Sequence, residues 1–477
     1  MVMGSLTGPF LVFRVMRSSL GHESGGMGGR AMAFEDLRSR KSVLWASVAF
    51  VLFLAAAVAV SCSQGGGRLS AGLALPSAGR PGVVPPMSEV PPMGEVVVSR
   101  IPEAAVKPAW ESSFSDAVLA STAASGDYVV ANVTYKEGRR SVPGFQVLGR
   151  NGKVLWERRF SDNRYRYSRA DSLAGGQFIG AVVLDYYDKG LFYLFDKDGR
   201  LLWTPRNVTG SITSLMSADG SRLALLDDSN HRLYVLTGAG EELASFSVSA
   251  RVTLRFTDGG DDLFVLDGDK IHVVDRKGGS TQFQGSVAAP SDLQVSPDGR
   301  YVAVTTTDGV DYLNLFRGDG ELGWKYPVDP GGTDKLVFSS DGRYLVLYDF
   351  GTRGGIAVFR VEDGAILWRS YFTPSEGRRG SVRSASIRPD TLEVEANYVE
   401  SYRLGKQTVE ENYLVVFTRQ GQAQWRVTLE ANVDLDASSD GSVVAVTTNN
   451  SIQVDGSVTN RLFWYDLLAL FNLKGGK

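Results

Sequence analysis

Residues that could act as a nucleophile, a base or a soft metal ligand are scarce in this chain of 477 residues, which has three histidines and one cysteine. Nucleophilic catalysis usually needs a histidine base, and His231 and His272 lie in strand-like runs, SNHRLYVL and DKIHVVD. Zinc sites, iron–sulfur sites and a disulfide framework all need more cysteine or histidine than this. We therefore expect no catalytic residue, no metal site and no cofactor. A carbohydrate hydrolase with paired carboxylates stays open as an alternative, since acidic residues are plentiful.

A second group of residues has chemistry suited to binding. Arginine and tyrosine recur in segments that we expect to be long loops, near both ends of the region after residue 110. Interfaces favour these side chains because they combine apolar area with directional donors. The candidate partner surface consists of Arg139, Arg140, Arg164, Tyr165, Arg166, Tyr167, Arg169, Arg378, Arg379, Tyr398, Tyr402, Arg403 and Lys406. We expect a protein or peptide partner there, with a glycan as an alternative ligand and solvated hairpins as the alternative interpretation.

The elements that must position these residues are repeats. Asp-Gly turns precede strand-like runs in SADGSRLALL, TDGGDDLFVL, SPDGRYVAVT, SSDGRYLVLY and SSDGSVVAVT. A glycine four residues before an aromatic residue recurs from Gly152–Trp156 to Gly421–Trp425, mostly at intervals of 39 to 47 residues. This period indicates a β-propeller, in which each repeat is a four-stranded blade. We expect the tryptophans to be apolar wedges between neighbouring blades.

The repeats predict an all-β propeller of about eight four-stranded blades, with seven as the alternative. The eighth repeat begins at Asp440-Gly441 and lacks a Gly-x-x-x-Trp strand. We expect the strand-like run 95–101 to supply this strand and close the ring. Closure would make the first and last repeats neighbours, and would bring the loops rich in Arg and Tyr together on one sector of one face.

The repeats carry a family resemblance. The copies DGRLLW, DGELGW and DGAILW resemble the repeats of quinoprotein-like propellers, and SPDGRYVAV resembles the WD-like repeats of periplasmic propellers of the Tol type. An anchored eight-bladed propeller of this kind is similar to the lipoprotein of the bacterial outer-membrane assembly machine, which implies a non-catalytic scaffold.

The same resemblance names an enzymatic alternative, a quinone-dependent dehydrogenase. For such an enzyme the resemblance implies a vicinal cysteine pair, a calcium ion held by Glu and Asn or Asp, and an Asp base. No cysteine occurs after residue 62. The repeats also have Asp-Gly where cofactor-bearing members tend to have Thr-Gly, so we do not expect this activity.

The first 94 residues predict an anchor and a tether. Residues 1–42 contain six basic and three acidic residues and form a cytoplasmic leader, with Met27 and Met32 as alternative start positions. Residues 43–60 carry no charge and as a helix would span roughly 27 Å, just enough for the hydrocarbon core. Cys62 follows directly and resembles the lipid-accepting cysteine of a bacterial lipoprotein signal, so a lipid anchor and an uncleaved transmembrane helix both stay open. Residues 61–94 are a Gly/Pro/Ser-rich tether.

Charge and orientation complete the prediction. The chain has 50 Lys and Arg residues against 53 Asp and Glu residues, which argues against a nucleic-acid partner. The basic leader should stay in the cytoplasm and place residues 95–477 outside the cytoplasmic membrane. We therefore expect a membrane-anchored, extracytoplasmic and non-enzymatic module that binds or scaffolds partners in a bacterial cell envelope.

Overall fold

A computed structural model of the chain describes residues 91–467, apart from 105, 115–117, 124, 204–205, 284, 286–288, 307–310, 330–331, 405–406, 430–432, 439–442 and 453–457. The predicted leader, apolar segment and Cys62 lie outside the described residues, as does Lys406. Within the described part, no helix is long and apolar enough to cross a membrane.

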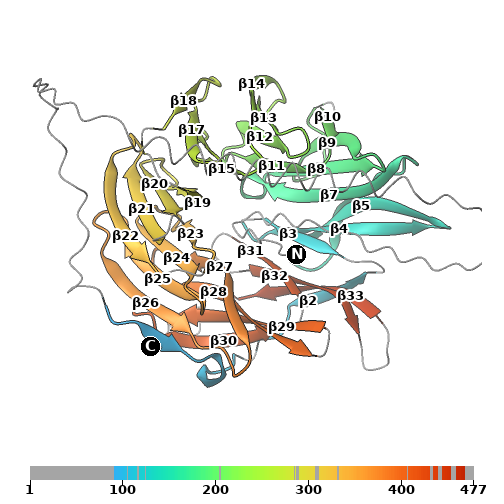
Figure 1. The fold of residues 1–477 in the computed structure, drawn as a ribbon. Coiled ribbons are helices and arrows are strands. Elements are labelled where there is room, and N and C mark those ends of the chain that lie inside the picture. The colour runs from blue at the N-terminus through green and yellow to red at the C-terminus, as the bar shows by residue number, and fades with distance from the viewer. Residues whose placement is uncertain are drawn as a thin grey trace, which may run out of the picture. The chain divides into compact units, whose positions relative to one another are not determined.

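The described residues form eight sheets in a ring, seven of four strands and one of five (Figure 1). This confirms the predicted propeller and its eight blades. Blades 1 to 4 consist of β3 (Leu119–Thr122), β4 (Tyr128–Glu137), β5 (Arg140–Gly149) and β6 (Val154–Arg159); β7 (Tyr165–Leu173), β8 (Phe178–Asp185), β9 (Lys189–Asp196) and β10 (Arg206–Thr209), with η3 (Ala174–Gly176) between β7 and β8; β11 (Ile212–Met216), β12 (Arg222–Asp227), β13 (Arg232–Thr237) and β14 (Glu242–Ser247); and β15 (Val252–Phe256), β16 (Leu263–Asp267), β17 (Lys270–Val274) and β18 (Ser280–Gln282). Blades 5 to 8 consist of β19 (Pro290–Val295), β20 (Tyr301–Thr306), β21 (Asp311–Arg317) and β22 (Leu322–Val328); β23 (Lys335–Phe338), β24 (Tyr344–Phe350), β25 (Gly355–Arg360) and β26 (Ile366–Phe372), joined by β1 (Gly94–Val96); β27 (Arg379–Ile387), β28 (Val394–Leu404), β29 (Gln407–Phe417) and β30 (Ala423–Leu429); and β31 (Val433–Ala437), β32 (Val443–Ile452), β33 (Val458–Asp466) and β2 (Trp110–Phe114).

The Asp-Gly turns form because a serine and an aspartate side chain make the hydrogen bonds that hold the backbone of the turn. In blade 3 the Ser217 hydroxyl donates to Asp219 Oδ1 at 2.7 Å, and the same oxygen accepts the backbone N–H two residues later at 3.0 Å. Gly220 adopts a φ of 70°, in the left-handed region that favours glycine. The arrangement recurs at Ser296–Asp298 and Ser339–Asp341. The repeated motif is therefore a repeated turn that starts the second strand of a blade.

At five junctions a tryptophan packs one blade against the next, as predicted. The indole of Trp156 in blade 1 lies against Gly199 in blade 2, where a Cβ atom would lie 2.8 Å from the ring. The indole N–H donates to the Lys197 carbonyl at 2.8 Å. The glycine of the Gly-x-x-x-aromatic motif therefore receives the tryptophan of the preceding blade. The same contact joins Trp110 to Gly152, Trp203 to Gly240, Trp324 to Gly364 and Trp368 to Gly421.

This contact gives a prediction with a matched control. Gly199 and Gly138 both have a positive φ, 90° and 63°, so alanine strains the backbone at both positions. A Cβ at Gly199 would collide with Trp156, whereas one at Gly138 would have no atom within 4 Å. Overpacking of this kind costs about 1–3 kcal/mol. We expect Gly199→Ala to lower the free energy of unfolding by that much more than Gly138→Ala in urea titrations. Equal losses would contradict the interlocking role of the indole.

The strand that closes the ring differs from the prediction. The run 95–101 lies on blade 6, where β1 pairs in parallel with β26 as a fifth strand, and η2 (Val98–Arg100) follows it. Blade 8 is completed by β2, which pairs antiparallel with β33. Trp110 in β2 supplies the missing tryptophan, and its indole N–H donates to the Arg150 carbonyl in blade 1 at 2.9 Å. No glycine stands four residues before Trp110, so the motif used to recognise outer strands does not mark this one.

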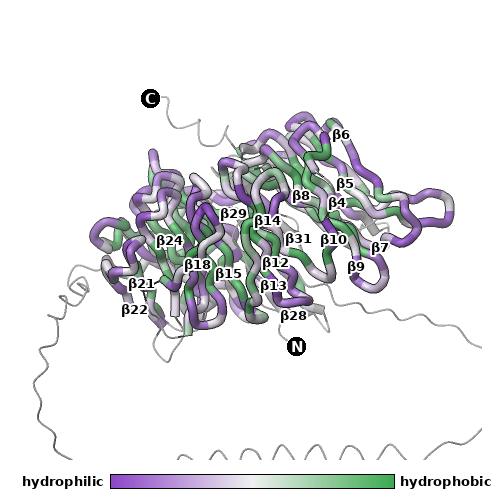
Figure 2. The backbone as a smooth tube through the Cα atoms, turned by 90° about the horizontal axis from the view of Figure 1, so that it is seen from above, coloured by the Kyte–Doolittle hydropathy of each residue, from purple (hydrophilic) through white to green (hydrophobic). Residues whose placement is uncertain are grey.

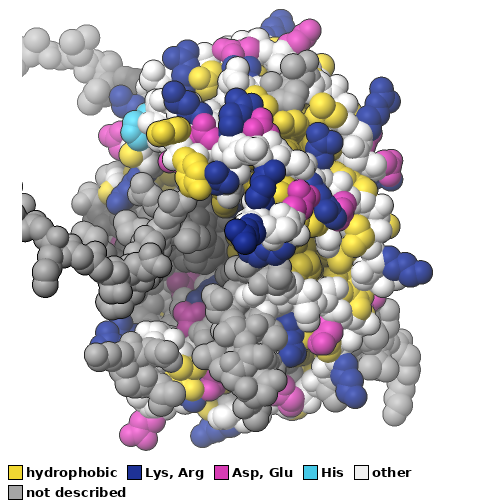
Figure 3. Space-filling view, turned by 90° about the vertical axis from the view of Figure 1, so that its right-hand side faces the viewer, with side chains coloured by type: hydrophobic (Ala, Val, Ile, Leu, Met, Phe, Trp, Pro, Cys, Tyr) yellow, Lys and Arg dark blue, Asp and Glu magenta, His cyan; other side chains and the backbone are white. Residues whose placement is uncertain are grey.

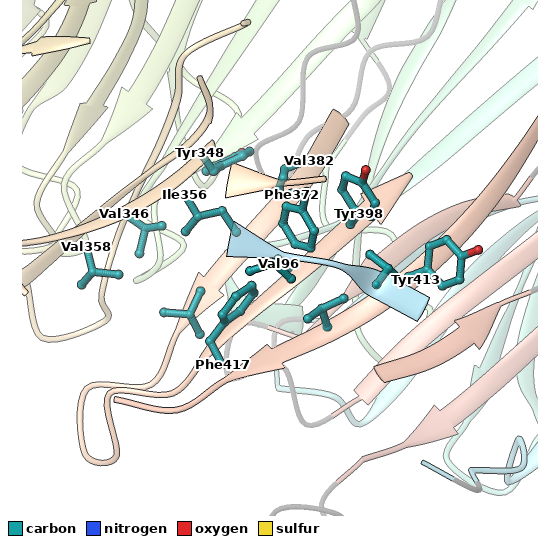
Figure 4. Close-up of a cluster of buried hydrophobic side chains, with 14 of the residues drawn as sticks. Val96, Val346, Tyr348, Ile356, Val358, Phe372, Val382, Tyr398, Tyr413 and Phe417 are labelled. Carbon is teal, nitrogen blue, oxygen red and sulfur yellow. The ribbon is translucent and has the colours of Figure 1, made fainter. Parts of the chain in front are cut away.

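The hydrophobic core consists of clusters between neighbouring blades, because each sheet buries both faces. Hydrophobic positions follow the strands and hydrophilic positions follow the turns (Figure 2). In the cluster between blades 6 and 7, Val96 of β1 lies close to Phe372 and Phe417 (Figure 4). After β1 the chain passes blade 7, where Ala104 N–H donates to the Arg426 carbonyl, and then enters β2.

Candidate partner surface

Connections between strands define the two faces of the propeller. The loop face carries the loops between the second and third strands of each blade and the connections from one blade to the next. The turn face carries the turns between the first and second strands and those between the third and fourth strands. The described second-to-third-strand loops on the loop face are residues 138–139, 186–188, 228–231, 268–269 and 351–354.

In blades 1 and 2 the predicted arginines are exposed on the loop face. Arg139 and Arg140 occupy the tip of the β4–β5 hairpin, and Arg140 donates to the Ser161 carbonyl at 3.3 Å. Arg164, in the connection to blade 2, pairs with Asp162 at 2.8 Å. Figure 3 views the molecule from the side to which the β4–β5 hairpin extends, and shows Lys and Arg side chains gathered there with hydrophobic side chains between them.

Two further tyrosines of this area are not among the residues of the predicted surface. Tyr186 and Tyr187 form most of the β8–β9 loop and are 63% and 82% exposed. The Arg166 guanidinium lies 4.1 Å from the centre of the Tyr186 ring, and Tyr167 is exposed on the neighbouring strand. The predicted surface rests on long loops, whereas this loop has only three residues, and the Asp-Tyr-Tyr-Asp run is the sequence signal that marks it. We call Arg139, Arg140, Arg164, Arg166, Tyr167, Tyr186 and Tyr187 the blade 1–2 patch.

Exposed apolar area is concentrated in the same two blades. Among the described residues, every strongly exposed large hydrophobic side chain lies between positions 154 and 202. Clustered exposure of this kind marks interaction sites, whereas single exposed apolar residues are ordinary. The side chains are Tyr167, Tyr186 and Tyr187 toward the loop face, and Val154, Leu155, Leu201 and Leu202 toward the turn face.

The arginine at the entrance to blade 7 is occupied by internal contacts. Arg378 lies 3.3 Å from Glu400 Oε2 and also pairs with Glu411. Its hydrogen bond lowers the pKa of the Glu411 carboxyl, and its guanidinium lies 4.3 Å from the centre of the Tyr402 ring. Arg378 and Tyr402 are therefore held within blade 7 rather than offered to a partner. The exposed candidates of this blade are Arg379 and Arg403.

Two tyrosines of the predicted surface are buried in the structure. Tyr165 is buried between blades 1 and 2, and Tyr398 is 0% exposed, stacked on Phe372 with ring centres 4.0 Å apart (Figure 4). Arg169 is half-buried and pairs with Asp171 at 3.0 Å. The cause is strand alternation: the expected long loops are largely extended strands, in which every second side chain points into the space between blades.

The exposed arginines of blades 1 and 2 and those of blade 7 do not contact each other in the described residues. Blade 8 lies between these blades in the ring. Its β32–β33 loop, residues 453–457, lies outside the described residues. The predicted single sector is therefore seen as two areas, of which the blade 1–2 patch has the exposed aromatic side chains.

A polar cavity of about 220 Å³ lies where blade 6 meets the inner strand of blade 7. Its lining includes Arg379, Asp349 and the pair Arg383–Glu410, which are 2.6 Å apart. Asp349 accepts hydrogen bonds from the Thr333 hydroxyl and the Val382 N–H, so it ties the two blades together. The lining contains no histidine or cysteine. Across the described residues, no group of three or more His, Cys, Asp or Glu side chains could hold a metal ion.

Comparison with known proteins agrees with this architecture. The family model described as outer membrane protein assembly factor BamB matches residues 188–452. No curated protein matches the chain.

Three solved structures are similar to the chain at low sequence identity. Sqt1 of Chaetomium thermophilum, bound to the N-terminus of the ribosomal protein L10, is 13% identical, with a TM-score of 0.46 over 74% of this chain and 98% of that one. Hsv2 of Kluyveromyces lactis is 10% identical, with a TM-score of 0.42 over 67% of this chain and 99% of that one. Hydrazine synthase of Kuenenia stuttgartiensis is 17% identical, with a TM-score of 0.42 over 55% of this chain and 78% of that one.

Proposed function

Because the chain belongs to the family of outer membrane protein assembly factor BamB, whose model matches more than half of it, we propose that it is a non-enzymatic binding or scaffolding propeller of a bacterial cell envelope. In this proposal residues 43–60, or a lipid on Cys62, anchor the chain to the cytoplasmic membrane. The propeller lies on the extracytoplasmic side.

The observation that carries the proposal is the blade 1–2 patch. It combines four arginines with three exposed tyrosines on adjacent blades, and Arg and Tyr are the residues most often found at binding hot spots. Its arginines fit a partner whose contacting segment carries acidic and apolar side chains. We propose a protein or peptide partner of this kind, and a glycan is the alternative ligand.

The proposal is tested by photocrosslinking in native membranes. A photoreactive amino acid replaces Tyr187 in the patch or, as the control, Asp269 in the short β16–β17 turn of blade 4. Both positions are exposed and lie on the loop face. We expect a discrete crosslinked partner from position 187 and none from position 269. Equal capture of the same proteins at both positions would refute the patch. Tight binding of a quinone cofactor, with dye reduction by an alcohol or sugar, would refute the non-enzymatic role.

The anchor has its own test. Fatty-acid labelling of the full chain is compared with labelling of Cys62→Ser. Loss of label and of membrane retention in the variant would assign the lipid anchor. An unchanged mass with unchanged retention would instead assign the membrane helix.

A further inference from the structure

The turn face of blades 1 and 2 carries an exposed apolar patch of its own. Val154 and Leu155 begin β6, and Leu201 and Leu202 occupy the matching positions in blade 2. Each side chain is 38–58% exposed. The pairs directly follow exposed cations, Lys153 and Arg200. We call these six residues the turn-face patch.

The two halves of the turn-face patch are held side by side. The Trp156 indole, next to Leu155, donates to the Lys197 carbonyl in the neighbouring turn and lies against Gly199. This contact fixes the start of β6 against the turn that presents Arg200. The two exposed aliphatic pairs therefore lie on the adjacent outer edges of blades 1 and 2.

The equivalent positions in other blades lack this character. In blade 5 the cation is replaced by Glu321, and Leu322 packs against the core. In blade 6, Ile366 and Leu367 are half-buried against core clusters and follow Ala365. Exposed aliphatic pairs preceded by a cation are thus a feature of blades 1 and 2 and not of the repeat itself.

A second observation concerns the direction in which the chain enters the propeller. β1 runs parallel to β26, which starts at the β25–β26 turn on the turn face. Just before β1, the Pro91 carbonyl accepts a hydrogen bond from Arg369 of β26, and at the other end of β1 the Val96 carbonyl accepts one from the Thr373 N–H, directly after β26. The chain therefore reaches β1 from the turn-face end of β26 and leaves toward the loop face.

We propose that the turn-face patch docks on an anionic lipid surface. Exposed aliphatic side chains beside Lys and Arg are the combination that binds a bilayer interface, since the alkyl groups enter the acyl boundary and the cations meet lipid phosphates. The orientation rests on the proposed membrane anchor, because a chain anchored before residue 91 approaches from this face. The loop face, with the blade 1–2 patch, then points away from the bilayer toward a partner.

The test uses the full chain with an environment-sensitive fluorescent amino acid at position 155 or 202, and at position 321 in blade 5 as the control. The protein is reconstituted into vesicles of phosphatidylglycerol and phosphatidylethanolamine, or of phosphatidylcholine alone. We expect a blue shift and quenching by brominated lipids at 155 and 202 in the anionic vesicles, and neither at 321. Lys153→Glu combined with Arg200→Glu should abolish the shift.

The experiment distinguishes failure of the lipid docking from failure of the membrane anchor. In one outcome the protein floats with the vesicles, but the labels at 155 and 202 stay as accessible to aqueous iodide as the label at 321. This result overturns the docking and leaves the anchor intact. Protein that does not float overturns the anchor and the docking together. A shift that appears only after envelope proteins are added identifies a protein contact and overturns lipid docking, as would equal shifts in neutral vesicles.

Discussion

Deletion of residues 110–114 should cost the propeller more stability than deletion of residues 94–101. β2 completes blade 8 and joins it to blade 1 through Trp110, whereas β1 adds a fifth strand to a blade that already has four. Without β2, β33 would become an exposed edge and the contact with Gly152 would disappear. We expect a loss of about 5 kcal/mol or more, beyond the 3–5 kcal/mol typical of replacing a packed tryptophan. Chemical denaturation of the full chain and the two deletions measures it.

A milder pair of variants controls for the deletion. Trp110→Ala removes the indole, while Glu111→Ala changes an exposed side chain of the same strand. Exposed substitutions of this kind usually stay within about 0.5 kcal/mol. Equal unfolding midpoints for these two variants, or a larger loss on deleting 94–101, would show that β2 does not close the ring.

Asp334→Asn should stabilise the protein at pH 8. Asp334 is 1% exposed and its Oδ1 has no hydrogen-bond partner in the described structure. Burial, followed by the charges of Asp311 and Asp349, raises its pKa to about 7, while Lys335 acts in the opposite direction. The folded state therefore favours the protonated acid, and this stabilisation is lost as pH rises from the unfolded pKa near 4 through 7. The full effect is about 4 kcal/mol at most.

The asparagine variant removes that charge and keeps the shape. Asp334 has a φ of 50°, a conformation that Asn also tolerates. We expect the free energy of unfolding of Asp334→Asn to exceed that of the wild type at pH 8 and to approach it near pH 5. Asp269→Asn, in an exposed turn, should follow the wild type. If the Asp334→Asn and wild-type profiles run parallel from pH 5 to 8, the buried carboxyl does not titrate as described.

Much of the fold could be predicted because its repeated motifs contain residues that the local backbone geometry and packing require. The Asp-Gly turns need a positive φ, and the glycine of the Gly-x-x-x-aromatic motif must make room for an indole, so both motifs mark real positions. The motif does not mark β2 because Trp110 lacks the glycine of its own repeat, whereas 95–101 has the apolar residues of a strand. Those residues are buried in the cluster of blades 6 and 7 instead.

The candidate surface was harder to predict, because exposure depends on strand register. Tyr398 and Arg403 lie in the same strand, yet the first is buried and the second exposed. Loop length is also a poor guide to exposure: Tyr186 and Tyr187 in a short loop are strongly exposed, whereas Tyr402 in the long strand β28 is half-buried. The internal pairing of Arg378 could not be predicted from the sequence, because its two glutamate partners lie close to it only in the folded blade.

The proposed binding role is tested by measuring partner recovery when the blade 1–2 patch is changed. The full chain is purified from detergent-solubilised membranes as wild type, as Arg166→Glu with Tyr187→Ala, and as the loop-face control Asp269→Ala with Lys270→Ala. Copurifying proteins are quantified by mass spectrometry, and unfolding midpoints confirm that all three proteins are folded. Because truncation of hot-spot residues costs about 2 kcal/mol or more, we expect at least a tenfold loss of the specific partner with the patch variant and no loss with the control. Equal recovery from all three proteins would contradict the claim that this propeller acts by binding a partner through blades 1 and 2.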